Sequence, residues 1–147
     1  MELAEAVCEL EGWELVKKPI NWDSKDMELN SGAIDCIWNG FTMNGREEEY
    51  TFSTPYVDNS QVIVVAEKSG MKTLEDLQGK SVGVQAASAA LDLLQSEEEG
   101  GRKALADTFS ALNEFADYNT AFTELQAGAL DALAIDVGVA NYQIKSR

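Results

Sequence analysis

The stretch Leu125-Gln-Ala-Gly-Ala-Leu-Asp-Ala-Leu133 decides the class of fold, because it has an echo earlier in the chain. Leu29-Asn-Ser-Gly-Ala-Ile-Asp-Cys-Ile37 repeats the same order: the end of a helix, a turn of small residues with a glycine, and an apolar strand with an aspartate. A glycine after a helical pattern is a stop signal, and a short apolar run after it favours a buried strand. The two copies lie too far apart to be a solenoid repeat. The sequence therefore predicts an α/β protein with two lobes, each a small, mostly parallel sheet flanked by helices.

The residues before and around the first copy predict one β-α-β unit. Apolar residues recur at helical spacing over residues 1–11, and a second helix is expected at residues 25–30. Residues 13–20 and 34–38 are the expected strands on either side of that second helix. A helical crossover between two strands implies that they pair in parallel.

The rest of the chain alternates strands and helices. Residues 61–66 are an almost wholly apolar, β-branched run and form the strongest predicted strand. Thr73 and Asp76 have the spacing of a capping box at the start of a short helix. Further strands are expected at residues 81–85, 109–115 and 129–136, and helices at residues 72–79, 86–94, 118–128 and 139–144. We expect lobe 1 to span residues 1–60, a hinge strand region residues 61–66, and lobe 2 residues 67–147.

Composition excludes several classes of function. The 147 residues carry a net charge of −15, which argues against binding to nucleic acid or to an anionic membrane surface. No apolar run has the length of a transmembrane helix, and residues 1–20 do not form a signal peptide, although a signal could have been removed. The absence of histidine removes the commonest general base and metal ligand. Cys8 and Cys36 are read as two buried small apolar residues, with a disulfide between them as the alternative.

Arg46 is the first candidate for a binding residue. It follows Thr42 by four residues, in a glycine-bounded loop beyond a predicted strand. A guanidinium presents a planar fork of donors that matches a carboxylate, and loops after strands commonly hold small ligands. The alternative is a surface arginine paired with the acidic residues 47–49.

Three other places could contribute to a binding site. Residues 84–90 turn from a strand directly into a helix, whose first N–H groups form a generic anion site, although Ser88 could simply be its N-cap. Asp136 at the end of a strand is placed to receive an ammonium group or to cap the next helix. Trp22 is either a core residue or an aromatic wall for a ligand. Together they fit a zwitterion, an α-amino acid, and no phosphate loop, metal-spaced cluster or nucleophile elbow appears.

The order of these motifs resembles the polar amino-acid solute-binding proteins of ABC transporters, family 3. The resemblance spans essentially the whole chain and is carried by Asn21-Trp-Asp, Leu29-Asn-Ser-Gly-Ala-Ile-Asp, Gly40-Phe-Thr, Arg46, Thr51-Phe-Ser-Thr-Pro-Tyr56, Thr73-Leu-Glu-Asp-Leu-Gln-Gly-Lys-Ser-Val-Gly-Val-Gln85 and Asp131-Ala-Leu-Ala-Ile-Asp136. It implies a periplasmic-binding-protein-like clamp of two lobes that closes on an amino acid outside the cytoplasmic membrane and delivers it to the transporter permease. It implies neither catalysis nor a cofactor.

The resemblance also implies roles for individual residues. Arg46 and Thr42 would hold the α-carboxylate, aided by backbone N–H groups near Ser88 and Ala89. Asp136 and the carbonyl region of Asn39 and Gly40 would receive the α-ammonium group. Trp22 and Phe41 would flank the side chain of the ligand, and Gln85 would contact it. The expected ligand-binding residues are thus Trp22, Asn39, Gly40, Phe41, Thr42, Arg46, Gln85, Ser88, Ala89 and Asp136.

Other functions remain open on the same fold. The chain could be the ligand-sensing domain of a receptor, a cyclohexadienyl-dehydratase-like enzyme that uses carboxylates, or a fragment that associates with itself without binding a ligand. Compared with the family, it lacks the usual first strand and the final segment that returns through the hinge. Sheets that lack strands have open edges, which favour homo-oligomers or strand exchange.

Overall fold

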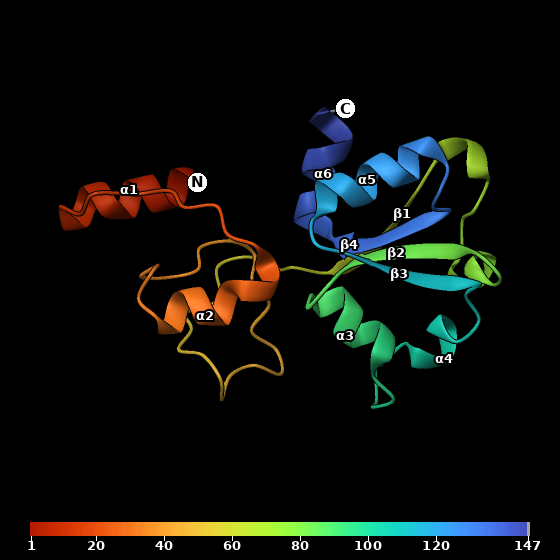
Figure 1. Ribbon diagram of the computed structural model, residues 1–147, viewed down its shortest axis with the longest axis horizontal. Helices are drawn as coiled ribbons and strands as arrows, with labels where there is room; N and C mark the ends of the chain where they lie inside the picture. The colour runs from red at the N-terminus through yellow and green to blue at the C-terminus, as the bar shows by residue number, and fades with distance from the viewer. Residues whose placement is uncertain (147) are drawn as a thin grey trace. The chain divides into compact units, whose positions relative to one another are not determined.

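The computed structural model describes residues 1–146 (Figure 1). Its internal contacts divide the chain into a smaller unit, residues 1–41, and a larger unit that begins at Thr42. Within the larger unit the chain alternates strands with helices, as the sequence predicts. The α/β class of the fold is therefore confirmed.

The smaller unit consists of helices and loops. Helix α1 (Glu2–Glu11) ends at Gly12, whose left-handed φ of 70° lets its N–H turn back to the carbonyls of Cys8 and Glu9. The short helix η1 (Trp22–Ser24) leads into α2 (Lys25–Asn30). Both helices predicted for this part of the chain are confirmed.

The two strands predicted in this unit are wrong. Residues 13–20 and 34–38 have no strand assignment, so the predicted β-α-β unit and its sheet do not form within the described residues. A strand is stabilised by the ladder of a neighbouring strand, and neither stretch has one. Trp13 and Val16 are exposed, so the apolar pattern does not bury a face. Cys8 is buried as predicted, whereas Cys36 is exposed, and neither cysteine forms a disulfide.

The larger unit is built on a four-stranded sheet with the order β1-β4-β2-β3. Its strands are β1 (Gln61–Val65), β2 (Ser81–Gln85), β3 (Ala111–Phe115) and β4 (Ala132–Asp136). Strands β4, β2 and β3 are parallel, and β1 pairs with β4 in the antiparallel direction. All four strands predicted after residue 60 are confirmed, and the sheet is mostly parallel as expected.

Helices cover both faces of this sheet (Figure 1). Helices α3 (Ala89–Gln95) and α4 (Lys103–Ala106) lie on one face, and α5 (Tyr118–Ala127) and α6 (Val137–Ser146) on the other. Two short helices, η2 (Glu67–Ser69) and η3 (Leu74–Leu77), connect β1 to β2, and the predicted capping box of Thr73 and Asp76 is present at η3. Helices η1, η2 and α4 were not predicted from the sequence. No helix within residues 1–146 combines the length and the apolar character needed to cross a membrane.

Strand β4 divides the core into two layers. Ala132 and Ala134 pack with the apolar residues of α3. Leu133 and Ile135 point to the other face and pack with Phe122 of α5. Residues 132–135 are all buried, because a strand between two others with helices on both faces has no solvent-facing side. The sheet is thus packed on both faces, and loops project at the ends of its strands.

Candidate functional site

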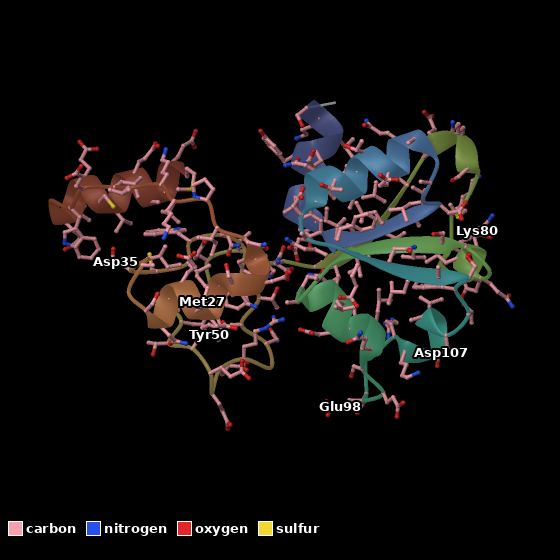
Figure 2. All side chains as sticks on the ribbon, viewed as in Figure 1. Met27, Asp35, Tyr50, Lys80, Glu98 and Asp107 are labelled. Atoms are coloured by element: carbon pink, nitrogen blue, oxygen red, sulfur yellow. The ribbon has the colours of Figure 1, made fainter. Side chains whose placement is uncertain are left out.

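The candidate site lies at the carboxyl edge of the sheet in the larger unit, which is the end of the sheet where its parallel strands terminate. The parallel strands β2 and β4 end at this edge with Gln85 and Asp136. Strand β1 runs the opposite way and therefore begins at the same edge, where Gln61 pairs with Asp136. Lys80, labelled in Figure 2, precedes β2 and marks the opposite edge. In a sheet with parallel strands, the carboxyl edge is where ligands commonly bind.

Two amide groups hold the carboxylate of Asp136. Gln61 donates from Nε2 to Asp136 Oδ1 over 2.7 Å, and Asn59 donates from Nδ2 to the same oxygen over 2.9 Å. A carboxylate only accepts hydrogen bonds, so both amides must turn their nitrogen atoms towards it. Ser60 lies between Asn59 and Gln61 in the sequence, and its carbonyl accepts a hydrogen bond from the Val137 N–H. The orientation of Asp136 is therefore fixed from the side of β1.

Arg46 and Thr42 are connected to the same network. Arg46 donates from Nη1 to the Thr42 carbonyl over 3.1 Å. The hydroxyl of Thr42 accepts a hydrogen bond of 3.3 Å from Asn59 Nδ2. Asn59 thus touches both Thr42 and Asp136. The structure brings together three of the residues predicted from the sequence, Thr42, Arg46 and Asp136, through one residue that was not predicted.

Arg46 also forms an ion pair with Asp92 on helix α3. The arginine side chain is only 13% exposed, whereas that of Asp92 is 61% exposed. The alternative reading named residues 47–49 as the acidic partners of Arg46, whereas the ion pair that the structure shows is with Asp92. The group expected to hold a carboxylate therefore already contacts a carboxylate of the chain.

The turn after β2 brings Gln85, Ser88 and Ala89 to the same edge. Ser88 is buried, donates to the Gln85 carbonyl over 2.7 Å and accepts from the Leu91 N–H over 3.2 Å, so it is the N-cap of α3. Gln85 donates its side-chain amide to the Ala116 carbonyl over 3.1 Å. Ala87 has a φ of 53°, the left-handed region in which glycine is usual. The backbone here is held in one conformation by several contacts.

Tyr118, the first residue of α5, adds a buried hydroxyl beside these groups. Burial, followed by the negative charge of Asp136, raises the pKa of the Tyr118 hydroxyl, and its neighbour Ser88 offsets this in part. The hydroxyl forms no hydrogen bond of normal geometry within the described chain. The side-chain oxygen of Gln61, Oε1, is the other buried polar atom in that condition. Buried polar atoms are normally paired, so two such atoms near Asp136 indicate a place suited to a polar ligand.

The remaining predicted residues belong to the smaller unit. Trp22 and Phe41 contact each other edge to face, with ring centroids 5.2 Å apart. The ammonium group of Lys25 lies 5.3 Å from the Trp22 ring, which is the geometry of a cation–π contact. Asn39 and Gly40 lie in the exposed loop that precedes Phe41. Trp22 is thus partly engaged by its own unit, and the two aromatic residues form one pair.

Sequence reasoning missed three residues of the network, Asn59, Gln61 and Asp92. It also missed the buried hydroxyl of Tyr118 beside them. Gln61 stands at the start of an apolar strand, and only the register of β1 with β4 reveals that it faces Asp136. Asp92 looks like an ordinary solvated helix residue until its partner 46 residues earlier is known. Among residues 1–146, no group of three or more His, Cys, Asp or Glu side chains is placed to hold a metal ion.

Comparison with known proteins gives a consistent family. Residues 1–136 match the bacterial extracellular solute-binding proteins, family 3. The L-cystine-binding protein TcyJ of Escherichia coli strain K12 is 30% identical over 139 residues, which are 92% of this chain and 49% of that protein. The ABC transporter arginine-binding protein 1 of the same organism is 27% identical over 147 residues, 99% of this chain and 56% of that protein. The chain thus spans about half the length of the curated relatives it matches.

Solved structures agree with this assignment. One is an ABC uptake transporter substrate-binding protein from Streptococcus pneumoniae with bound histidine, which has a TM-score of 0.89 and 35% sequence identity to this chain. The match covers 99% of this chain and 58% of the chain of that protein. An ancestral amino acid-binding protein described as a precursor of cyclohexadienyl dehydratase has a TM-score of 0.84 and 27% identity, covering 98% and 62%. With its motifs, its sheet and these matches in agreement, the chain belongs to the bacterial extracellular solute-binding proteins, family 3.

Proposed function

We propose that this chain forms an amino acid-binding site of an extracytoplasmic solute-binding protein that serves an ABC transporter. Arg46 and Thr42 would bind the α-carboxylate, together with backbone N–H groups near Ser88 and Ala89. Asp136 would bind the α-ammonium group, with the carbonyl region of Asn39 and Gly40. Trp22, Phe41 and Gln85 would contact the side chain of the ligand.

One observation carries this proposal. A guanidinium and a carboxylate of opposite charge, those of Arg46 and Asp136, are joined through Thr42 and Asn59 by hydrogen bonds of 2.9–3.3 Å. An α-amino acid carries its own two opposite charges on one carbon atom, and binding it requires a cation and an anion close to each other. The net charge of −15 repels a free anion, whereas a zwitterion has no net charge to be repelled.

Isothermal titration calorimetry with L-histidine, L-arginine and L-cystine tests the proposal. We expect at least one of them to bind, and Arg46→Ala to weaken its binding by roughly tenfold to a hundredfold, since a hydrogen bond to a charged group contributes about 1.5–3 kcal/mol. Arg102→Ala is the matched control, because the Arg102 guanidinium donates to the loop carbonyls of Gly100 and Gly101 and lies outside this network. If no amino acid binds, or if both variants weaken binding equally, the proposal is wrong.

We further propose that the protein binds without catalysis and closes as two lobes, residues 1–60 and 67–147, about residues 61–66. The two curated relatives from Escherichia coli are named as amino acid-binding proteins, which supports binding without catalysis. The match to a dehydratase precursor makes an enzyme the second candidate. A turnover assay with a cyclohexadienyl acid separates the two, because product formation that depends on Asp136 would favour the enzyme.

Small-angle X-ray scattering with and without ligand tests the proposed closure of the two lobes. Light scattering tests whether the chain associates with itself.

A further inference from the structure

We propose that Gln61, assisted by Asn59, is the residue that sets how strongly the site distinguishes an α-amino acid from the same molecule without its amino group. The inference rests on the proposed function and deepens it. Gln61 would act through Asp136, by fixing the direction of its carboxylate, and would itself accept a hydrogen bond from the ammonium group. It lies outside the set of residues expected from the motifs.

The contacts of Asp136 support the positioning role. Both amide donors, from Gln61 and Asn59, bind the same oxygen, Oδ1. Two donors on one oxygen restrict the positions that this oxygen can take. The backbone register places Gln61 directly opposite Asp136, so the contact depends on the sheet and not on a flexible loop. Sites built on strands hold their geometry more closely than sites on loops.

The unpaired oxygen of Gln61 supports the second role. Its Nε2 is 2.7 Å from Asp136 Oδ1, and the covalent geometry of an amide places Oε1 within about 5 Å of that carboxylate oxygen. This Oε1 is buried and has no hydrogen-bond partner within the described chain. A buried acceptor without a donor costs about 1–3 kcal/mol, so a donor is expected there. An ammonium group has N–H donors in several directions, and one such group can reach two acceptors at that separation.

Asn59 extends the same arrangement to the other end of the ligand. Its Nδ2 lies 2.9 Å from Asp136 and 3.3 Å from the Thr42 hydroxyl. The distance between the group for the ammonium and the group for the carboxylate is therefore set by one amide. A zwitterion has its two charges at a fixed separation, and a fixed pair of partners recognises it without reorganisation.

The test compares two pairs of ligands by calorimetry on the whole chain: L-histidine with imidazolepropionate, and L-arginine with δ-guanidinovalerate. Each second compound lacks only the α-ammonium group. The dissociation constant of the des-amino compound divided by that of the amino acid therefore measures recognition of the ammonium group. We expect Gln61→Met to reduce this ratio by about tenfold, through weaker binding of the amino acid, and to leave the affinity for the des-amino compound nearly unchanged. Gln61→Asn, whose shorter amide cannot reach Asp136, should give the same result if Gln61→Met does not fold.

Gln143→Met is the matched control. Gln143 also donates its side-chain amide to another side chain, Asn119 Oδ1, over 2.8 Å, but it lies in α6 and outside the network. It should lower the melting temperature without changing the ratio. Equal losses for both members of a pair in Gln61→Met would overturn the inference and leave the proposed function standing. Failure of the unmodified chain to bind either amino acid would instead overturn the proposed function, and the inference with it.

Discussion

The ion pair between Arg46 and Asp92 leads to a prediction of unusual sign: removing a charged residue from the site should strengthen binding. Asp92 presents a carboxylate to the guanidinium that is proposed to receive the carboxylate of the ligand. A ligand must share Arg46 with this residue or displace it. Asp92→Asn keeps the size of the side chain and removes its charge.

The size of the effect follows from the exposure of the two partners. Asp92 is 61% exposed, so the pair resembles surface ion pairs, which contribute about 0.2–1 kcal/mol. Arg46 is only 13% exposed, which places the pair towards the upper end of that range. Because 1.4 kcal/mol is a factor of ten, we expect the variant to bind an amino acid about threefold to fivefold more tightly. The gain should shrink at high salt, which screens an exposed charge.

Calorimetry with L-arginine or L-histidine at low and high ionic strength measures this effect. Asp107→Asn is a close control, because Asp107 forms a comparable exposed ion pair with Lys103 on α4 and is 63% exposed. Asp107, labelled in Figure 2, directly follows α4. The control removes one negative charge without touching Arg46. Unchanged or weaker binding in Asp92→Asn, or an equal gain in the control, would refute the competition.

The remaining predictions concern stability. Leu133→Ala should lower the free energy of unfolding by about 2–5 kcal/mol in urea titrations, because Leu133 is fully buried in the central strand. Ala87→Gly should raise the melting temperature by a few degrees at most, since relief of the left-handed φ of 53° outweighs the extra entropy of glycine in the unfolded chain. Asp117 accepts from the Thr120 N–H at the start of α5, which lowers its pKa, so Asp117→Ala should cost about 1 kcal/mol at neutral pH. That cost should disappear as the pH falls from the ordinary pKa of aspartate through the lowered one, and chemical denaturation at several pH values would show it.

Local sequence signals predicted the larger unit well. Strands 61–66, 81–85, 109–115 and 129–136 were confirmed. Three of them are largely apolar runs bounded by glycine or by polar turn residues, whereas 109–115 has a weaker pattern that includes Asn113 and Glu114. The same reasoning failed for residues 13–20 and 34–38, whose apolar patterns are just as strand-like. The hydrogen bonds of a helix lie within one segment, so local sequence signals indicate a helix more directly than a strand. A strand additionally needs a neighbour, and a single segment does not show whether one is present.

By itself, the sequence indicated the fold class, the family and the candidate site residues: an arginine and a threonine in one loop, and an aspartate at the end of a strand. Tertiary structure decided their partners. Asn59 and Gln61 meet Asp136 because β1 runs antiparallel to β4 in one register, and Asp92 meets Arg46 across 46 residues of chain. Motifs record which residues follow one another along the chain. Hydrogen bonds and ion pairs depend on distance in space, which only the pairing of strands and the packing of helices fix.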